Sequence, residues 1–220
     1  MNSKSTLVIL GAGGFAREVA CHYRDTRKND ANWAGFSEIL FVDDVTETIE
    51  VVISNKRFKV IKDWNFPDPK NSQFLVGIGS PKAKKIMADK ALEKGLEPAI
   101  TLVHPRALVQ DASYIGRGGV ITPGVVVTTN VVIGDYVILN LNTTVGHDAK
   151  IEDFCTVNPS CSISGNTLLG RGVTLGTGTV TREKSTIAPG VTVGAQSAVI
   201  KDLLEEDITA IGCPAKKLER

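Results

Sequence analysis

His147 and Asp148 are adjacent side chains that could transfer a proton, in a chain that contains only three histidines. A neutral imidazole accepts a proton near physiological pH, and a neighbouring carboxylate can orient the ring or stabilise its charged form. An attacking amine or hydroxyl must lose a proton, which such a pair could accept. We therefore predict that His147 is a general base. The alternatives are a surface imidazole and a merely solvated carboxylate.

A glycine-rich segment near the N-terminus could bind phosphate. Residues 11–16 read GAGGFA, follow the apolar run of residues 6–10 and open a helical pattern, which fits the G-x-G-x-x-A fingerprint. Backbone amides at such a turn, together with the N-terminus of the helix, bind a diphosphate. The alternative is that the glycines only permit a tight turn between a strand and a helix.

The elements that would position this segment alternate along the first hundred residues. Short apolar runs predict buried parallel strands, and apolar residues at helical spacing, or a proline start with a glycine end, predict helices. The predicted strands are residues 6–10, 39–42 and 74–78, and the predicted helices are residues 15–24 and 81–94. The pattern indicates a small α/β sheet that ends near residues 100–103.

The histidine–aspartate pair lies in a second half that has a strict period of six. Nine of the 12 aromatic residues precede residue 103. From Val103 to Val199, every sixth residue is Val, Ile or Leu except Thr181. The residue four positions later is small or β-branched until Leu203. This period predicts a hexapeptide β-helix, in which one apolar side chain per strand points into a narrow triangular prism.

The β-helix register makes further predictions. Glycines directly after the apolar position are expected to supply the backbone angles of the corners; they are Gly116, Gly134, Gly146, Gly170, Gly176 and Gly194. Cys155 and Cys161 fall on the small inward position, so we predict that both lie in the core. His147 comes two residues after the inward Val145, so its side chain is expected outside the interior.

Charge, hydropathy and cysteine content argue against several classes of protein. With 25 basic and 24 acidic side chains, the net charge of +1 gives no electrostatic reason to expect nucleic acid or an anionic membrane as a partner. No apolar run suits a signal segment or a membrane span. Four cysteines without a CxxC pair indicate reduced thiols in the cytoplasm and no cysteine-based metal site.

The chain resembles the hexapeptide-repeat acyltransferases, and within them the branch of sialic-acid O-acetyltransferases and nucleotide-aminosugar N-acetyltransferases (NeuD/PglD-like). The resemblance covers nearly the whole chain and is carried by LGAGGFAREV (10–19), FVDD (41–44), VGIGSP (76–81), HPRA (104–107), LNTTVGHDAKIEDF (141–154), SGN (164–166) and GCPAK (212–216). It implies a Rossmann-like nucleotide-sugar-binding domain at residues 1–102 and a left-handed β-helix acetyltransferase domain with a C-terminal tail at residues 103–220. It also implies a homotrimer with active sites between neighbouring prisms, and acetyl-CoA as the donor.

The resemblance also assigns roles to residues on the acceptor side. His147 matches the proposed base of the family, with Asp148 beside it, and Asn140 matches a position near the sugar amine. The nucleotide is expected at Gly11, Gly13, Gly14 and Phe15, with Asp43 and Asp44 near the base or ribose and Ile78 and Gly79 lining the same crevice.

On the donor side, the resemblance implies a groove beside the stacked coils for the pantetheine arm. The backbone N–H of Gly165 would face the thioester carbonyl and stabilise its developing negative charge. Thr177 and Ala195 match later points along the groove, and Lys216 could meet a CoA phosphate. Thr156 is also expected to contact acetyl-CoA, at a position where some relatives have histidine. A corner asparagine at residue 140 and a solvated lysine at residue 216 are the alternatives.

The expected function is an acetyl-CoA-dependent N-acetyltransferase that acts on a nucleotide-linked amino sugar, without a metal, in the synthesis of a bacterial surface polysaccharide or glycan. O-acetylation of sialic acid or another sugar hydroxyl is the alternative, because the base does not reveal whether nitrogen or oxygen attacks. A zinc hydratase resembling the γ carbonic anhydrases needs three histidine ligands, and the prism offers only His104 and His147. An NAD-dependent enzyme fits poorly, because the acidic pair Asp43-Asp44 lies beyond the usual spacing of about 20 residues. A non-catalytic scaffold is a further alternative.

Overall fold

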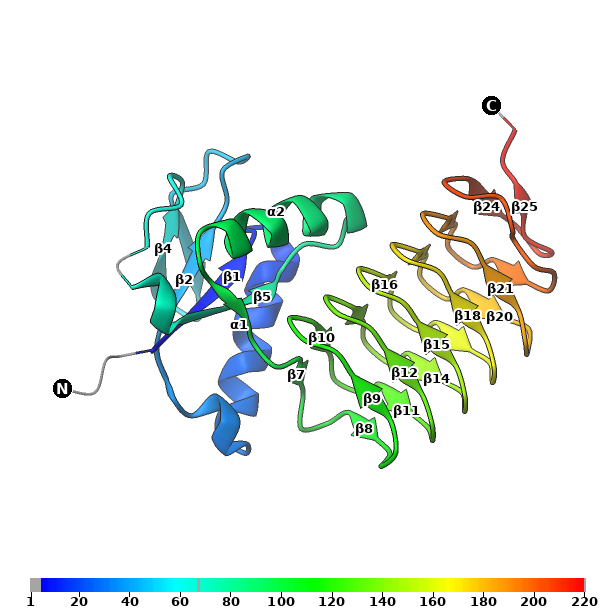
Figure 1. The fold of residues 1–220 in the computed structure, drawn as a ribbon, viewed down its shortest axis with the longest axis horizontal. Coiled ribbons are helices and arrows are strands. Elements are labelled where there is room, and N and C mark those ends of the chain that lie inside the picture. The colour runs from blue at the N-terminus through cyan, green and yellow to red at the C-terminus, as the bar shows by residue number, and fades with distance from the viewer. Residues whose placement is uncertain (1–4, 67, 220) are drawn as a thin grey trace.

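The computed structural model describes residues 5–66 and 68–219, which form an N-terminal α/β part and a β-helix (Figure 1). The α/β part is built on one sheet with the strand order β3-β4-β2-β1-β5-β6. Its strands are β1 (Ser5–Leu10), β2 (Phe36–Val42), β3 (Glu50–Ile53), β4 (Lys56–Ile61), β5 (Ser72–Val76) and β6 (Glu97–Pro98), and its helices are α1 (Gly14–Thr26) and α2 (Pro81–Glu93), with short 3-10 turns at Ala31–Trp33 and Pro69–Asn71. The three strands and two helices predicted from the sequence are confirmed, with ends that differ by a few residues.

The two helices cover opposite faces of this sheet. Leu7 and Ile9 of β1 belong to the buried cluster of α1, whereas Val8 and Leu10 belong to the buried cluster of α2. Strand β1 pairs in parallel with β2 on one side and with β5 on the other. The chain continues from β1 into α1 on one face of the sheet and from β5 into α2 on the other face. A crevice therefore opens at the carboxyl ends of these two strands, where α/β sheets bind ligands.

Strands β3 and β4 form a hairpin that the sequence analysis did not predict. They pair antiparallel and are joined by Ser54 and Asn55, whose φ angles are 47° and 63°, as a two-residue type I′ turn requires. The Ser-Asn pair lacks the glycine that usually marks such a turn, which made the signal weak. Strand β4 pairs in parallel with β2, and the chain between these two strands forms β3 where a crossover helix is usual.

The rest of the chain winds into a prism of two-residue parallel strands (Figure 1). Face 1 contains β7, β10, β13, β16, β19 and β22 and continues into β24 and β25; face 2 contains β8, β11, β14, β17, β20 and β23; face 3 contains β9, β12, β15, β18 and β21. From β7 to β23, strands on the same face pair in parallel with the strand one coil later, 18 residues along the chain, as Val120 pairs with Ile138. Face 1 ends differently, because β24 and β25 pair antiparallel. The predicted hexapeptide β-helix is therefore confirmed, and we name its corners by the faces they join: corner 1/2, corner 2/3 and corner 3/1.

The strand bounds follow the six-residue period. They are Leu102–Val103 (β7), Leu108–Val109 (β8), Tyr114–Ile115 (β9), Val120–Ile121 (β10), Val126–Val127 (β11), Val132–Ile133 (β12), Ile138–Leu139 (β13), Thr144–Val145 (β14), Lys150–Ile151 (β15), Thr156–Val157 (β16), Ser162–Ile163 (β17), Leu168–Leu169 (β18), Thr174–Leu175 (β19), Val180–Thr181 (β20), Thr186–Ile187 (β21), Thr192–Val193 (β22), Ala198–Val199 (β23), Thr209–Ile211 (β24) and Lys216–Lys217 (β25). The second residue of most strands points inward, and Cys155 and Cys161 lie in the core as predicted.

The predicted role of the corner glycines is wrong. None of the six glycines that follow the inward position has a positive φ; positive φ occurs two residues later, for example at Gly118 and Tyr136. A Cβ at Gly134 would lie only 2.4 Å from Asp153 Oδ1, and one at Gly146 would lie 2.5 Å from the backbone nitrogen of Gly165. Glycine is needed there because the next coil passes where a side chain would begin.

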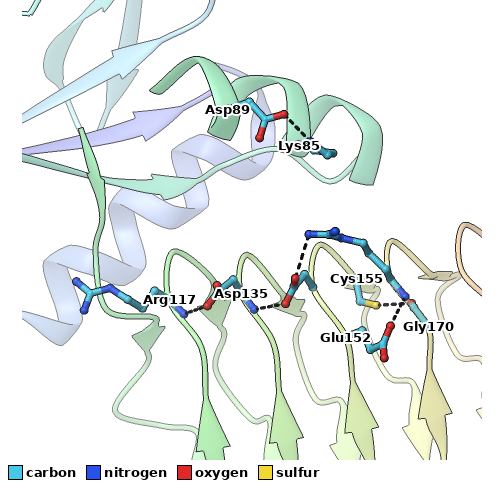
Figure 2. A network of polar contacts seen from close by, with 9 residues as sticks. Lys85, Asp89, Arg117, Asp135, Glu152, Cys155 and Gly170 are labelled. Carbon is cyan, nitrogen blue, oxygen red and sulfur yellow. Dashed lines mark hydrogen bonds and ion pairs between the residues drawn. The ribbon is translucent and has the colours of Figure 1, made fainter. Parts of the chain in front are cut away.

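Carboxylates join successive coils along corner 3/1 (Figure 2). Asp135 accepts a hydrogen bond from the N–H of Arg117 at 2.7 Å, and Asp153 accepts one from the N–H of Asp135 at 3.0 Å. The N–H of Arg171 donates to Glu152, and the Arg171 guanidinium pairs with Asp153 at 3.0 Å. Corner N–H groups that the strand pairing leaves free are thus satisfied by side chains of an adjoining coil.

Helix α2 fastens the α/β part to the same corner. Lys84 is fully buried, and its Nζ donates to the carbonyls of Tyr136 at 3.1 Å and Cys155 at 2.8 Å. Burial lowers the pKa of Lys84 to about 7. The Tyr136 ring lies between the rings of Phe74 and Phe154, with centroid distances of 5.9 and 4.8 Å. Strand β5, helix α2 and two coils therefore share one core.

We predict that Ile151→Asp prevents folding. Ile151 is fully buried in β15, and an unpaired carboxylate in the prism would cost several kcal/mol. Lys150→Asp is the matched control, because residue 150 is the exposed neighbour in the same strand. Solubility and circular dichroism would check both variants; a soluble, folded Ile151→Asp protein would contradict the strand register.

Candidate active site

His147 and Asp148 lie at corner 2/3, just after β14, with half-exposed side chains. The Nδ1 atom of His147 is 2.8 Å from Asp148 Oδ2. With the proton on Nδ1, the ring donates to the carboxylate and leaves Nε2 free to accept a proton. Hydrogen bonds from His147, first, and from Asn130 hold the pKa of Asp148 below its usual value. Asp148 therefore stays ionised and fixes the tautomer of the ring.

Asn130 is a contact that the sequence analysis missed. Its Nδ2 donates to Asp148 Oδ1 at 3.4 Å from the preceding coil, at the equivalent place in corner 2/3. Both Asn130 and Asp148 have positive φ, 57° and 59°. The period was the available signal, because residues 18 positions apart stack along a corner. Asn130 and His147 together occupy both carboxylate oxygens of Asp148.

Gly165 lies beside the imidazole in the following coil. A Cβ at Gly165 would be 2.7 Å from His147 Nε2 and 2.8 Å from Cε1, so only glycine leaves room for the ring. Within the described residues, the N–H of Gly165 donates to no protein acceptor. A residue that packs against the imidazole and has a free N–H suits a site that needs a general base and an oxyanion donor.

The glycine-rich turn lies at the crevice between β1 and β5. Gly11 has φ +98° and approaches Ile78 closely, because a Cβ at Gly11 would lie 2.8 Å from Ile78 Cγ1. Gly13 and Gly79 are exposed, and a Cβ at either would meet no atom within 4 Å. Gly14 begins α1 and Phe15 packs beneath it, against both buried clusters. Open space at Gly13 and Gly79 thus adjoins the N–H groups at the start of α1, which suits an anion.

Gly77 is a second residue that the sequence analysis missed. A Cβ at Gly77 would lie 2.8 Å from both the Ala16 Cβ and the Leu10 carbonyl oxygen. The N–H of Gly77 donates to the same carbonyl at 2.8 Å. The glycine therefore lets the loop after β5 lie directly against the start of α1, which forms the floor of the crevice.

Asp43 joins the glycine-rich turn to the loop after β2 through hydrogen bonds. It is buried, and its carboxylate accepts hydrogen bonds from the N–H groups of Ala12 at 3.0 Å, Val45 at 3.1 Å and Thr46 at 2.9 Å. Burial would raise the pKa of Asp43, but the hydrogen bonds from Thr46, Val45 and Ala12 outweigh it and lower the pKa. Both oxygens of Asp43 are thus engaged in holding the glycine-rich turn against the loop after β2.

Asp44 belongs to a different contact. Its Oδ2 accepts from Lys90 Nζ at 2.7 Å and from Trp64 Nε1 at 2.9 Å. The Lys90 hydrogen bond is the largest cause of the lowered pKa of Asp44. This residue joins the loop after β2 to helix α2, at the edge of the crevice.

The remaining candidate residues lie on other parts of the prism. Asn140 follows β13 at corner 1/2, and Thr177 and Ala195 are exposed at the same corner in later coils. Lys216 is exposed in β25, at the far end of face 1. Thr156 is buried on the outer side of face 1, where its hydroxyl donates to the carbonyl of Gly79 at 2.6 Å.

The crevice and the imidazole do not meet within one chain. The loop that carries Gly79 rests on face 1 through Thr156, whereas His147 projects from corner 2/3. In a triangular prism, that corner is opposite face 1. Asn140 lies at corner 1/2, a third place. One chain thus presents the crevice and the imidazole on different sides of the prism.

The described ranges hold no group of three or more His, Cys, Asp or Glu side chains that could bind a metal ion. His104 is instead buried between the first coil and α1, where its Nδ1 accepts from the N–H of Arg106 and its ring lies 5.3 Å from the ring of His22. In the same ranges, no helix has the length and hydropathy needed to cross a membrane.

Comparisons with known proteins agree with this architecture. The family model described as the PglD N-terminal domain matches residues 6–91. The GDP-perosamine N-acetyltransferase of Escherichia coli O157:H7 is 29% identical over 224 residues, with 96% of each chain covered. The acetyltransferase domain of PglB from Neisseria gonorrhoeae FA1090, solved with acetyl coenzyme A, is 30% identical, with 98% of this chain and 100% of that chain covered and a TM-score of 0.80. PerB from Caulobacter crescentus, solved with CoA and GDP-perosamine, is 26% identical, with 99% of each chain covered and a TM-score of 0.82.

A prism of hexapeptide coils with a histidine–carboxylate pair at one corner, joined to a glycine-rich α/β part, defines an acyltransferase of the hexapeptide-repeat class. Within that class, the chain belongs to the NeuD/PglD-like family. The family expected from the sequence motifs is thereby confirmed.

We predict that Gly165→Ala lowers acyl-transfer turnover on the order of 100-fold, because the new methyl group would displace the His147 ring by about 1 Å. The φ of Gly165 is not positive, so alanine fits the backbone and folding should be unchanged. Gly35→Ala is the control, since a Cβ there has only a distant neighbour at 4.0 Å. Steady-state kinetics and thermal melting would separate the two effects; wild-type turnover in Gly165→Ala would contradict the placement of the ring.

Proposed function

We propose that this protein is an acetyl-CoA-dependent N-acetyltransferase that acts on a nucleotide-linked amino sugar, with His147 as the general base. The observation that carries the proposal is the 2.8 Å contact between His147 Nδ1 and Asp148 Oδ2, which leaves Nε2 available beside Gly165. Relatives named as GDP-perosamine N-acetyltransferases, and one solved with CoA and GDP-perosamine, support the substrate class. The pathway we propose is the synthesis of a bacterial surface polysaccharide or glycan precursor.

The proposed step is direct acetyl transfer. The sugar amine nitrogen attacks the thioester carbon of acetyl-CoA, and the proton that it loses passes to His147 Nε2. The carbonyl oxygen becomes negative in the tetrahedral intermediate, where the free N–H of Gly165 can donate to it. The intermediate then breaks its C–S bond, the leaving CoA sulfur takes up the proton held by His147 Nε2, and the products are the N-acetyl sugar and CoA. Asp148 stabilises the imidazolium that forms between these events.

The acceptor nucleotide is proposed to lie in the crevice at Gly13, Gly14 and Gly79. The N–H groups at the start of α1 would bind its diphosphate, with residues 11–15 and 78–79 around it. Because the carboxylate oxygens of Asp43 already accept backbone N–H groups, its part is to hold the turn in shape for the ligand. We propose that residues 1–102 form the nucleotide-sugar-binding domain and residues 103–220 the acetyltransferase domain. The cytoplasm is the proposed location, because the four cysteines are free thiols, as expected in a reducing compartment.

A homotrimer would complete the site. Since His147 lies at the corner opposite the face that carries the crevice, the acceptor amine must reach the histidine of a neighbouring chain. If face 2 of each prism turns toward a threefold axis, corner 1/2 of one chain meets corner 2/3 of the next. Asn140, Thr177 and Ala195 would then stand opposite His147 and Gly165. Exposed apolar residues on face 2, Leu108 and Val180, suit such packing.

We predict that His147→Ala lowers kcat by roughly 10²–10⁴, the usual contribution of a general base, without loss of folding. Thiol release from acetyl-CoA would be measured with nucleotide-linked 3- and 4-amino sugars and with free sialic acid. Turnover with sialic acid alone would favour O-acetylation, and a wild-type kcat in His147→Ala would refute the mechanism.

The assembly prediction is a particle with three times the 23.5 kDa mass of the chain, measured by light scattering at micromolar concentration. Mixing His147→Ala chains with chains impaired in the crevice by Gly13→Asp should restore part of the activity, because a mixed trimer contains one intact composite site. A fully active monomer, or no recovery on mixing and reassembly, would contradict the shared site.

A further inference from the structure

Thr156 contacts the loop between β5 and α2, which carries Gly79, whereas the sequence led us to expect a contact with acetyl-CoA. Its hydroxyl is 2.6 Å from the carbonyl oxygen of Gly79, and its side chain is almost completely buried. A buried hydroxyl whose single proton is already donated to a carbonyl has no proton left to donate to a second ligand. The contact therefore ties the prism to the loop between β5 and α2.

This loop has few other attachments at its centre. Its start is held by the N–H of Gly77, which donates to the Leu10 carbonyl at 2.8 Å. Its end becomes the cap of α2, where the Ser80 carbonyl accepts from the N–H of Lys84 at 2.8 Å. Between them, in the part of the chain that the structure describes, the N–H groups of Ile78, Gly79 and Ser80 donate to no protein acceptor. Thr156 supplies the hydrogen bond that holds the middle of the loop.

The orientation of one peptide group follows from this hydrogen bond. In a trans peptide, the C=O of one residue and the N–H of the next point in opposite directions. Since the Gly79 carbonyl points toward Thr156 on the prism, the N–H of Ser80 must point away from the prism. A rotated peptide would instead expose the carbonyl oxygen, which repels an anion. Gly79 is the residue at which such rotation is easiest.

Resting on the proposed function, we infer that Thr156 is a positioning residue for the acceptor: it holds the Gly79–Ser80 peptide so that its N–H faces the diphosphate of the nucleotide. The prism thereby shapes the crevice of the α/β part. The nearby Lys84 contacts to Tyr136 and Cys155 fix the same edge of α2, so the loop is held at its centre and just beyond its end.

The test compares Thr156→Val with Thr174→Val. Valine keeps the shape of threonine but removes the hydroxyl. Thr174 is the matched control, because it pairs with Thr156 one coil later on face 1 and makes no side-chain hydrogen bond to the residues described. Thr156→Ser retains a hydroxyl and serves as the rescue, and Thr156→Ala is a second loss variant in case valine impairs folding. Thermal melting would report folding of each variant.

Binding of GDP, UDP and dTDP would be measured by calorimetry, without acetyl-CoA. For the diphosphate that binds the wild type most tightly, we expect roughly three- to tenfold weaker binding in Thr156→Val and Thr156→Ala, from the loss of one net hydrogen bond. Binding should be near wild type in Thr156→Ser and Thr174→Val. The KM for acetyl-CoA should be the same in all five proteins.

Two results would overturn the inference alone: wild-type diphosphate affinity in both loss variants, or a raised KM for acetyl-CoA with unchanged diphosphate binding, which would restore Thr156 to the donor site. If the wild type binds none of the three diphosphates and releases no thiol with the amino-sugar panel, the proposed function fails and this inference fails with it. If the first of these results is accompanied by a lower melting temperature, the hydrogen bond stabilises the fold and does not position the acceptor.

Discussion

The narrow interior of the prism constrains the rest of the molecule. Each two-residue strand has room for one apolar side chain inside, and the small residue at the corner, such as Cys155 or Cys161, fills the remaining space. Consecutive coils then approach so closely that a Cβ at Gly134 or Gly146 would collide with the next coil. Function is therefore confined to side chains that point outward from corners and faces. The imidazole of His147, the free N–H of Gly165 and the hydroxyl of Thr156 all lie there.

The six-residue period predicted the β-helix because one physical requirement, an apolar residue in a fixed place, is met at 16 of the 17 positions from Val103 to Val199, with Thr181 as the exception. The period also placed His147 outside the core. It did not give the right reason for the corner glycines, because these glycines are needed for close contact with residues 19 positions later in the next coil, such as Asp153 at Gly134, and not for local backbone angles. The β3–β4 hairpin was missed for a similar reason: its Ser54-Asn55 turn is a weak local signal, and β4 is stabilised by pairing with β2.

The motifs indicated which segments form the candidate site better than they indicated what each residue does there. Asp43 and Asp44 lie at the crevice, yet Asp43 accepts backbone N–H groups and Asp44 contacts Trp64 and Lys90. Asn130 has no motif of its own, and its position is meaningful only because it stacks below Asp148. Thr156 and Gly79 are 77 positions apart in sequence, and no spacing rule connects them. Such pairings arise from how the α/β part docks on the prism, which a single sequence does not reveal.

The docking of α2 has a consequence for how such chains can change in length during evolution. The rings of Tyr136 and Phe154 fix the α/β part to two successive coils, and His147 lies between them in the chain. Each coil contacts only its neighbours. Coils could therefore be gained or lost beyond residue 175 without changing the distance between the crevice and His147 along the axis of the β-helix. Insertion of one coil between residues 136 and 147 would instead change this axial distance by about 4.8 Å, the spacing of neighbouring strands. We expect insertions and deletions to accumulate toward the C-terminal end of the solenoid and to be rare between Tyr136 and Phe154, the segment that contains His147.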